Sequence, residues 1–460
     1  MLTFFRVNGF KSFHNMEMHF TPFTVIAGAN ASGKSNLFDA LKLLSRLAET
    51  DNLKKAFREQ RGEFLELFTQ YGNGAFAKEI SFCAEMIVDR TVKDAWGNEA
   101  VLKYTRLRYE LVVNRYTNSA GIEDLSVSFE RLENLKHQSD DWIKFIPKGK
   151  RDYWRPKVKT GKRGTPYIDT IKEHDLLTVL VPQDGTSGNK RRFPIQNATR
   201  TVLSSFDTVD FPHVFAAKEE MRSWKFLQLN PEDLRQPTSK SMGSDVVSES
   251  GKNLAAALYR IKLENPYALK EISRKLQTFL PEFITVDVFD DTENRQYVIR
   301  LTDINNRTYS SRVLSEGTLR ILTLCIFEHD SKFSSLLCFE EPENGVNPVR
   351  ISIMAKLLRE LSTNFEDEFH PLRQVIVNTH SPVLVKEINN WVKDDLVSIW
   401  YAEIRKRVTT IDGQRMVLNI TNMSPVSKEG GIQMNIFETS EQDKKITLAK
   451  VDQYLSTLTV

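Results

Sequence analysis

The spacing of apolar residues predicts an α/β order in the first fifty positions. Residues 2–13 alternate between apolar and polar positions as in a strand. Residues 22–27 form a short apolar run that ends next to a glycine, which is typical of a buried parallel strand. Leucines then recur at helical spacing between residues 35 and 47. The pattern predicts a strand, a glycine-rich loop and a helix in that order.

Three strand-like runs follow, and the last third of the chain returns to alternating helices and strands. The runs at 79–89, 102–114 and 124–132 predict a mixed or antiparallel β lobe. Beyond them we expect a helical stretch at 250–279 with a break near Pro266, a hairpin at 283–301, helices at 315–329, 347–361 and 382–390, and strands at 335–339, 374–377, 396–402 and 416–420. We find no internal repeat and no long heptad series, so we expect no extended coiled-coil arm.

The composition is that of an ordinary globular protein, but the charge is unevenly distributed. The 460 residues suit one large head with insertions or two to three subdomains, and the net charge of +3 excludes a strongly basic nucleic-acid binder. Residues 131–200, however, hold 16 Lys and Arg against 8 Asp and Glu. This stretch lacks clear periodicity, so we interpret it as an insertion or flexible surface module that could contact an anionic partner.

The cysteines, the N-terminal residues and the length of the apolar runs indicate the compartment. Cys83, Cys325 and Cys338 lie in apolar stretches without metal-binding spacing, so we expect buried thiols in a reducing environment. The N-terminal residues lack the pattern of a secretory signal, and no segment reaches the length of about 18 apolar residues that spans a bilayer. We therefore expect a cytoplasmic protein.

A phosphate-binding loop stands between the first buried strand and the first helix. Residues 28–35, Gly-Ala-Asn-Ala-Ser-Gly-Lys-Ser, match the pattern G-x-x-x-x-G-K-[ST]. Glycines let the backbone wrap closely around a polyphosphate, and the following helix offers its positive end. In this pattern Lys34 neutralises charge on the β- and γ-phosphates, and Ser35 ligates Mg²⁺. The motif predicts binding of ATP with Mg²⁺.

An acidic pair follows a buried strand later in the chain. Residues 336–342 read Leu-Leu-Cys-Phe-Glu-Glu-Pro, which places two carboxylates at the C-terminal edge of a parallel sheet, where ligands bind. In this interpretation Glu340 holds Mg²⁺, and Glu341 polarises the attacking water as a general base. Taken alone, two glutamates after a strand are more often a solvated strand end.

Two further motifs complete an ordered set of four. Residues 314–318 place Ser315 and Gly317 at the start of a helix, which favours anion binding but also suits ordinary helix capping. A buried strand ends at His380, whose imidazole can hydrogen-bond a γ-phosphate or the attacking water. The order of phosphate loop, serine motif, acidic strand and terminal histidine is far more specific than any one part.

This set resembles the heads of SMC/RecF-type ABC ATPases. More narrowly, it resembles the standalone prokaryotic RecF-like ATPases of anti-phage defence systems, the PtuA-like and AriA-like proteins. The residues that carry the resemblance are 7–13, 28–36, 314–320, 339–348 and 379–382. It implies an α/β P-loop NTPase of ABC/SMC-head type, with a mixed β lobe, a parallel-sheet core and a helical subdomain.

The resemblance also implies a shared site. Two heads would sandwich two ATP molecules, with Ser315 and Gly317 of one copy contacting the γ-phosphate that Lys34 of the other holds. Motifs and resemblance together give as ATP-binding residues Gly28, Asn30, Gly33, Lys34, Ser35, Asn36, Lys11, Gln70, Ser315 and Gly317, as Mg²⁺ ligands Ser35 and Glu340, and as catalytic residues Glu341 and His380. The family usually has Asp where Glu340 stands, and residues 343–348 lack the Asp expected at the dimer seam of transporter-type heads.

The same reasoning divides the chain into five parts. We expect the N-terminal part of the ATPase head at 1–135, a basic insertion at 136–210, a helical and hairpin subdomain at 211–300, the C-terminal part of the head at 301–402 and a C-terminal extension at 403–460.

Three functions remain open at this stage. The first is a slow ATPase that forms a homodimer or a higher even-numbered homo-oligomer and controls a separate effector, such as a nuclease or toxin, in anti-phage defence. The alternative is a RecF/SMC-like DNA-repair or maintenance clamp that contacts DNA through residues 136–200, where Trp142, Tyr153 and Trp154 would stack on bases. The third is a scaffold that binds ATP to assemble and hardly hydrolyses it.

Overall fold

The computed structural model of the chain describes residues 1–158, 164–173, 176–183, 190–195, 198–241, 245–333, 335–368, 371–391, 394–411, 413–426, 451 and 453. Its helices are α1 (Lys34–Glu49), α2 (Leu53–Arg58), α3 (Arg151–Trp154), α4 (Pro212–Arg222), α5 (Pro231–Arg235), α6 (Leu254–Glu264), α7 (Ala268–Phe279), α8 (Glu316–His329), α9 (Ile351–Glu360) and α10 (Pro382–Asn389).

The strands fall into one core sheet, one antiparallel lobe and three small sheets. They are β1 (Leu2–Asn8), β2 (Met16–His19), β3 (Phe23–Ala27), β4 (Glu79–Ile87), β5 (Thr91–Lys93), β6 (Glu99–Val101), β7 (Arg106–Thr117), β8 (Glu123–Asn134), β9 (Asp169–Glu173), β10 (Leu176–Pro182), β11 (Lys190–Pro194), β12 (Lys225–Leu227), β13 (Thr238–Ser239), β14 (Phe283–Asp291), β15 (Gln296–Asp303), β16 (Thr308–Ser310), β17 (Ser335–Glu340), β18 (Arg373–Thr379), β19 (Val397–Ile411) and β20 (Gln414–Pro425).

The core sheet positions the candidate site. Its order is β12-β17-β18-β3-β19-β20, and all neighbours are parallel except the β19–β20 hairpin. Strands β3 and β17 are apolar and buried on both faces, as expected for central strands of a parallel sheet. Because parallel strands end at one edge, the phosphate loop after β3, the acidic pair after β17 and the histidine after β18 meet there.

The antiparallel lobe has the order β2-β1-β4-β7-β8. The three strand-like runs predicted from the sequence correspond to β4, β7 and β8, with β7 extending three residues past the expected end. One face of the lobe packs on α1, whose apolar stripe includes Leu37, Leu41 and Leu44, all fully buried. The predicted fold class, a mixed β lobe beside a parallel core of P-loop type, is confirmed.

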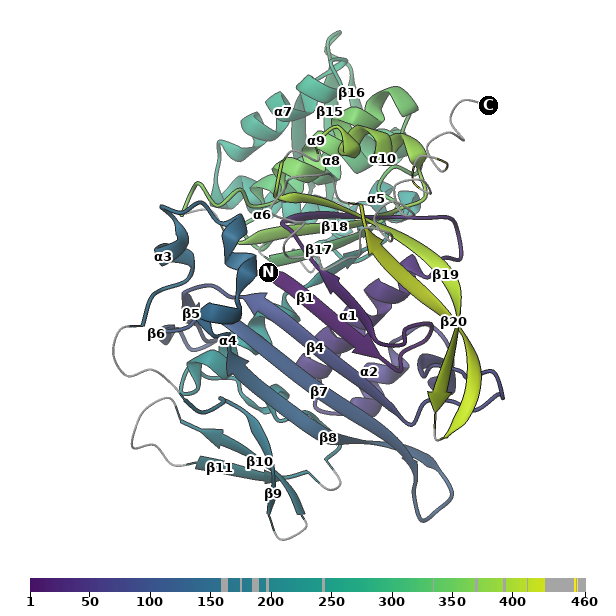
Figure 1. Cartoon of the computed structure of the whole chain (residues 1–460). Coiled ribbons are helices and arrows are strands. Elements are labelled where there is room, and N and C mark those ends of the chain that lie inside the picture. The colour runs from purple at the N-terminus through teal and green to yellow at the C-terminus, as the bar shows by residue number, and fades with distance from the viewer. Residues whose placement is uncertain are drawn as a thin grey trace.

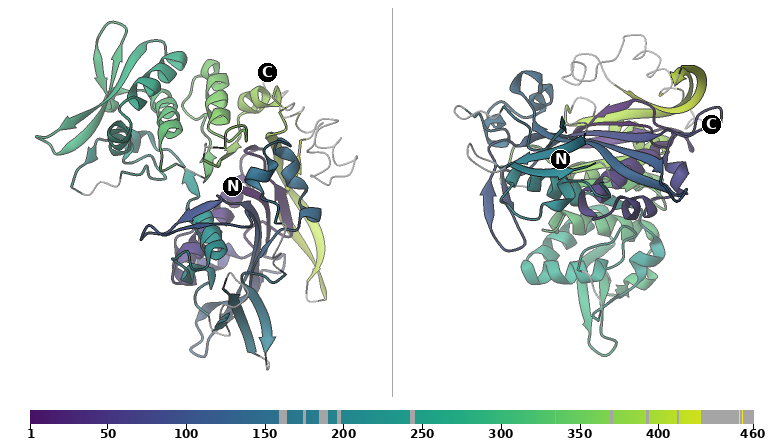
Figure 2. Two further views of the ribbon diagram at one scale, coloured as in Figure 1. Left: turned by 90° about the vertical axis from the view of Figure 1, so that its left-hand side faces the viewer. Right: turned by 90° about the horizontal axis from the view of Figure 1, so that it is seen from below.

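A helical and hairpin subdomain lies at the opposite end of the molecule from β7 and β8 (Figures 1 and 2). Helices α6 and α7 pack against the β14–β15 hairpin, and the predicted helix break lies at residues 265–267, around Pro266. The expected boundary at 300 falls inside β15, and that at 402 falls inside β19, so these two boundaries do not separate folded units.

The basic stretch at 136–200 is partly an integral piece of the lobe. Trp142 and Trp154 are 3% and 6% exposed, and Trp142 Nε1 donates a hydrogen bond to Phe20 O at 2.6 Å. The expectation that these two rings stack on nucleic-acid bases is therefore wrong, because the apolar core already covers them. Tyr153 is half-buried, and its hydroxyl donates to Glu368 O at 2.9 Å. Residues 159–163, 174–175, 184–189 and 196–197 of this stretch lie outside the described residues.

The C-terminal hairpin is longer than the sequence pattern predicts. Strand β19 runs nine residues past the expected end, and β20 covers residues on both sides of the predicted 416–420. Residues 403–411 and 414–425 therefore continue the core sheet, whereas most of the rest of the expected extension to 460 lies outside the described residues.

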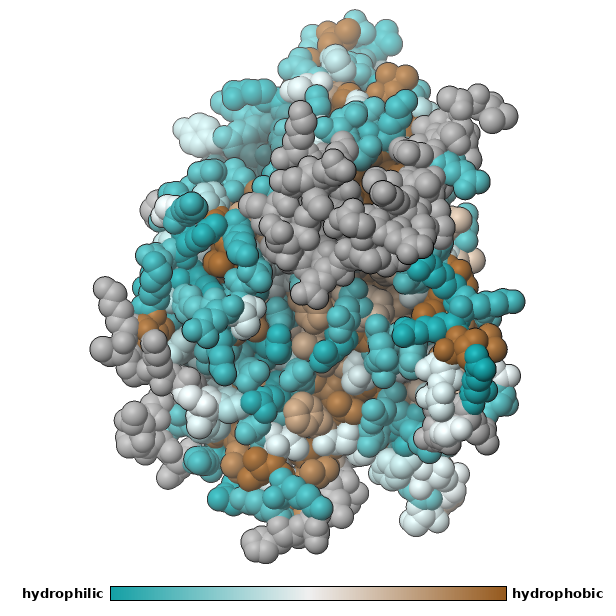
Figure 3. All heavy atoms as spheres, in the orientation of Figure 1, coloured by the Kyte–Doolittle hydropathy of each residue, from teal (hydrophilic) through white to brown (hydrophobic). Residues whose placement is uncertain are grey.

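The surface and the interior agree with the composition. The three cysteines are buried, as predicted. The face in Figure 3 is mostly hydrophilic where the structure describes it, with apolar atoms in small separate groups. In the described parts of the chain, no helix combines the length and the apolar character needed to cross a membrane.

Candidate functional site

The phosphate loop owes its shape to two glycines under close packing. Gly33, the residue before α1, has a φ of 89°, and a Cβ there would lie 1.9 Å from Thr421 Oγ1. A Cβ on Gly28 would lie 2.5 Å from Ala402 O. Larger residues are excluded at both positions because the β19–β20 hairpin lies directly against the loop. The C-terminal hairpin is thus one wall of the phosphate loop, which the sequence did not indicate.

Lys34 carries the positive charge of the loop. Its side chain is 6% exposed, and its Nζ donates to Gly28 O and Ala29 O, both at 2.8 Å. Burial lowers the pKa of Lys34 and outweighs the opposing effect of the nearby glutamates. The first turn of α1 contains no acidic residue, so the positive end of the helix dipole is not offset there. The loop therefore offers positive potential to an anion.

One cavity of about 360 Å³ brings most of the predicted residues together. It is lined by Asn30, Ala31, Ser32, Gly33, Lys34, Ser35, Asn36, Glu340, Glu341 and Asn378. Phosphate-loop residues and both carboxylates of the acidic strand thus face one space. Gly28 lies at the base of the same loop, and Asn36 Nδ2 donates to Ser12 Oγ at 2.8 Å.

Glu341 and His380 form a hydrogen-bonded pair. His380 Nδ1 lies 2.8 Å from Glu341 Oε1, and Asn344 Nδ2 donates to the other carboxylate oxygen at 2.7 Å. Burial raises the pKa of Glu341. These hydrogen bonds and the charges of His380 and Lys34 lower the pKa by more than burial raises it, so the net shift is downward. Glu341 is therefore a carboxylate at neutral pH, the form that a general base requires.

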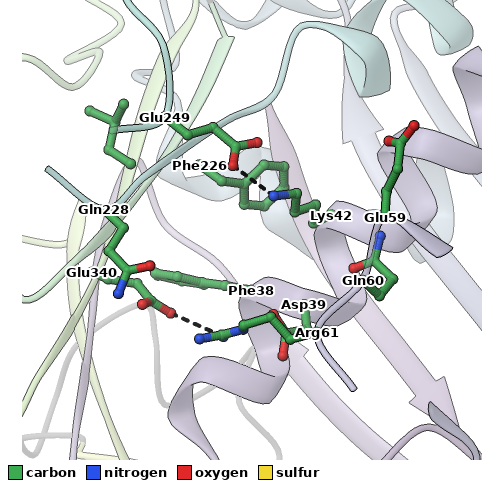
Figure 4. A pocket seen from close by; sticks show the side chains of 11 residues that line it. Phe38, Asp39, Lys42, Glu59, Gln60, Arg61, Phe226, Gln228, Glu249 and Glu340 are labelled. Atoms are coloured by element: carbon green, nitrogen blue, oxygen red, sulfur yellow. Dashed lines mark hydrogen bonds and ion pairs between the residues drawn. The ribbon is translucent and has the colours of Figure 1, made fainter. Parts of the chain in front are cut away.

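Glu340 faces a cluster of charges beside the cavity (Figure 4). Arg61 Nη2 lies 3.5 Å from Glu340 Oε1 and 2.9 Å from Asp39 Oδ1, and the guanidinium binds Asp39 through two nitrogens. Lys11 Nζ donates to Asp39 Oδ2 at 2.7 Å. Sequence reasoning missed Arg61 and Asp39, because neither belongs to a recognisable motif. Lys11, predicted to touch phosphate, is placed on Asp39 and does not line the phosphate-loop cavity.

Gln70 is not brought to the phosphate loop. It is exposed, and it lines a separate cavity of about 740 Å³ together with Lys11, Arg61 and Val417. This cavity lies between the turn after β1, the segment after α2 and strand β20. The assignment of Gln70 to phosphate has no geometric support within one chain.

Ser315 and Gly317 also lie outside the phosphate-loop cavity. Ser315 caps α8, with its Oγ accepting from Thr318 N at 3.3 Å. A Cβ on Gly317 would lie 3.0 Å from Gly345 O, so the serine motif packs on the segment that follows the acidic pair. Within one chain the motif is a helix cap, which is one of the two interpretations that the sequence allowed.

The donor set of the cavity fits a hard divalent cation. The Ser35 hydroxyl and the Glu340 carboxylate both line it, and oxygen ligands of this kind are those that Mg²⁺ prefers. In the described residues, no group of three or more His, Cys, Asp and Glu residues is arranged to hold a metal ion, so the protein ligands here would be Ser35 and Glu340 alone.

Comparison with known families matches two ATPase domains. Residues 1–180 match a family described as "AAA ATPase domain". Residues 174–386 match one described as "AAA domain, putative AbiEii toxin, Type IV TA system". The first match contains the phosphate loop, and the second contains Ser315, the Glu340–Glu341 pair and His380. The resemblance to an ATPase domain that the motifs predicted is confirmed.

Solved SMC heads are among the similar structures. An SmcHead bound to the C-winged helix domain of ScpA is 14% identical, with 93% of this chain and 98% of that chain covered and a TM-score of 0.49. The SMC head domain from Thermotoga maritima is 14% identical over 93% and 99%, with a TM-score of 0.36. The Smc head domain of Pyrococcus furiosus with an extended coiled coil, bound to the C-terminal domain of ScpA, is 14% identical over 98% and 99%, with a TM-score of 0.43. No curated protein sequence matches the chain.

Proposed function

We propose that this chain, whose residues 1–180 and 174–386 match AAA-type ATPase domains, binds and hydrolyses ATP in a site that a second copy of the chain completes. The observation that carries the proposal is the separation of two motifs. The cavity holds Lys34, Ser35 and the two glutamates, whereas Ser315 caps a helix outside it.

Each residue of the cavity has a role in this proposal. Lys34 and the N–H groups of the loop bind the β- and γ-phosphates. Ser35 and Glu340 hold Mg²⁺, which when bound offsets the charge on the phosphate oxygens. Glu341 accepts the proton of the attacking water, and His380 holds the Glu341 carboxylate in position through its Nδ1 at 2.8 Å. Arg61 Nη2 lies 3.5 Å from one oxygen of Glu340, so the guanidinium would compete with Mg²⁺ for that oxygen.

In the proposed dimer, the partner chain supplies the serine motif that lies outside the phosphate-loop cavity of a single chain. The N-terminal end of α8 carries the Ser315 hydroxyl and a helix dipole, which together attract an anion. A symmetric dimer would place this end of each copy over the phosphate loop of the other and so create two equal sites. Slow hydrolysis fits a switch, in which ATP binding assembles the pair and hydrolysis releases it.

The test mixes two inactive variants. Lys34→Ala removes the phosphate-binding cation, and Ser315→Arg blocks the serine motif while sparing the phosphate loop of its own chain. A mixed dimer then holds one damaged pair of motifs and one intact pair. If half of the dimers are mixed, we expect about a quarter of the wild-type ATPase activity per subunit, whereas each variant alone is inactive.

The controls separate pairing from simple loss of function. Ser315→Arg should bind ATP like the wild type, and a doubly substituted chain mixed with wild type should give no recovery beyond the wild-type share. If the two single variants stay inactive at every mixing ratio, although both are folded and form mixed dimers by mass, the shared site is refuted.

We further propose that the head controls a separate effector, such as a nuclease or a toxin, in anti-phage defence. One matched family is described as "AAA domain, putative AbiEii toxin, Type IV TA system", and this link to a toxin–antitoxin system supports the proposal. The described residues contain no group of three or more His, Cys, Asp and Glu residues arranged to hold a metal ion, which argues against a metal-dependent nuclease centre within them. Cleavage of DNA or RNA by the pure chain with Mg²⁺ or Mn²⁺ would contradict the need for an effector.

The alternative, an ATP-dependent DNA clamp, has lost two of its three proposed stacking residues, since Trp142 and Trp154 are buried. Exposed basic residues remain on β11, at Lys190, Arg191 and Arg192. DNA affinity that falls steeply with salt and is lost when these three residues are replaced by Ser would favour the clamp.

A further inference from the structure

Asn378 lies at the point where three strands of the site meet. It stands near the end of β18, paired with Ile26 of β3 on one side and with Glu340 of β17 on the other. Its side chain is 2% exposed and lines the phosphate-loop cavity. No motif and no family match assigns a role to this amide.

The amide has contacts on both sides of the cavity. Nδ2 lies 3.4 Å from Ser35 Oγ, and Oδ1 lies 3.3 Å from Glu341 N. The Glu341 N–H can only donate, so Oδ1 must face it and Nδ2 must face the hydroxyl. Ser35 Oγ therefore accepts from Asn378. Its own proton and its remaining lone pair then point away from Asn378.

The contact to Glu341 holds a strained backbone. Glu341 has a φ of 46°, in the left-handed region that costs a residue with a Cβ about 1–2 kcal/mol. Its N–H donates to Asn378 O at 3.0 Å as well as to Oδ1. The two neighbours of Asn378 are also tied to this turn, because Thr379 donates to Glu343 and His380 bonds Glu341. The turn thus keeps the Glu341 carboxylate on the cavity side.

We propose that Asn378 is a positioning residue that orients the Ser35 hydroxyl for a Mg²⁺–nucleotide complex and holds the Glu341 turn in place at the same time. This inference rests on the proposed ATPase function. Through Ser35 and Glu341, Asn378 would act on the cation and on the attacking water. It links the acidic strand to Ser35, which lies 343 residues before Asn378 in the sequence.

The experiment measures ATP affinity with Mg²⁺ and with EDTA, by equilibrium binding of a fluorescent ATP analogue. The ratio of the ATP affinity with Mg²⁺ to the affinity in EDTA is the Mg²⁺ factor of each variant, and in the wild type it is greater than one. In Asn378→Leu, which has a similar volume but no polar atoms, we expect that factor to fall about tenfold, as for one lost hydrogen bond, while affinity in EDTA stays within about twofold. In Asn378→Asp the acceptor for Glu341 N remains and the donor to Ser35 is lost, so the Mg²⁺ factor changes while kcat falls less than in Asn378→Leu.

The matched control is Gln374→Leu on the same strand. Gln374 is fully buried and bonds Leu2 and Thr21, away from the cavity, so its loss should lower the melting temperature and leave the Mg²⁺ factor unchanged. If Asn378→Leu does not fold, Asn378→Ala gives the same test with a smaller side chain that also lacks polar atoms.

The outcomes separate this inference from the proposed function. A wild-type chain without Mg²⁺-dependent ATP binding would refute the proposed function itself. A wild type that binds Mg²⁺–ATP, beside Asn378 variants whose Mg²⁺ factor is unchanged or whose affinity falls equally in EDTA, would overturn the role of Asn378 alone.

Discussion

Glu341 and Glu343 stand two residues apart, and the same substitution should lower ATP hydrolysis strongly at Glu341 and hardly at all at Glu343. Glu341 lines the cavity, and its pKa is lowered overall, so it is ionised at neutral pH. Glu343 is 7% exposed and does not line the cavity, and burial raises its pKa. Glu341→Gln therefore removes a charge that faces the cavity, whereas Glu343→Gln replaces a buried group outside the cavity.

The size of the effect follows from the geometry. A positioned general base contributes roughly 10²–10⁴-fold to a rate, or about 2.7–5.5 kcal/mol of barrier, so turnover by Glu341→Gln should fall by that factor. The Glu341–His380 pair is more than one-third exposed on both sides and contributes less than about 1 kcal/mol to folding. A glutamine amide can donate to His380 Nδ1 and accept from Asn344, so the variant should fold. Removing one negative charge near the phosphates should leave ATP affinity unchanged or higher.

The assay is single-turnover phosphate release, run beside ATP binding and particle mass. We expect Glu341→Gln to bind ATP, release phosphate at least a hundredfold more slowly and remain paired with ATP bound, while Glu343→Gln stays within about threefold of the wild type. Two results would refute the reasoning: Glu341→Gln releasing phosphate at the wild-type rate, or Glu343→Gln losing as much activity as Glu341→Gln. If the wild type itself hardly hydrolyses ATP but assembles with it, the scaffold interpretation is favoured.

Two further predictions concern packing and pH. Gly33→Ala should weaken ATP binding at least tenfold, because its φ of 89° disfavours a Cβ by about 1–2 kcal/mol and that Cβ would meet Thr421. Thr421→Ala added to it should restore affinity only in part, and a Gly33→Ala chain with wild-type affinity would contradict the packing. Burial lowers the pKa of His19 from 6.5 to about 4, with Glu85 opposing and Arg106 adding to the shift. The unfolded chain therefore binds the proton more readily, and about 2–3 kcal/mol of stability should be lost as pH falls from about 6.5 to 4. Urea unfolding across this range should show a shallower pH dependence in His19→Gln than in the wild type, and equal slopes would exclude His19 as the cause.

The sequence predicts local parts of the site well because their signals are local. The strand, loop and helix around Gly33 and Lys34 depend on neighbouring residues alone, and the buried runs before Glu340 and His380 are continuous in sequence. The three predicted β-rich runs likewise form the adjacent antiparallel strands β4, β7 and β8.

What the sequence did not predict depends on which strands become neighbours. Asn378 meets Ser35 only because β18 lies beside β3, and Thr421 reaches Gly33 only because β20 folds back across the loop. The interpretation of Trp142 as a stacking residue failed for the same reason, since the core that covers it is formed by distant segments. Charge counts along the chain carry no information about such coverage.

The place of β3 between β18 and β19 has a consequence for biosynthesis. During translation the phosphate loop leaves the ribosome long before either of its two flanking strands has been made, so the segment must wait without its partners. A nascent chain interrupted ahead of β18 would present an unpaired apolar strand for aggregation or degradation, and it would lack Asn378 and His380. Nucleotide can then stabilise only those chains whose synthesis has passed β19, and ligand availability would favour the survival of finished molecules over fragments.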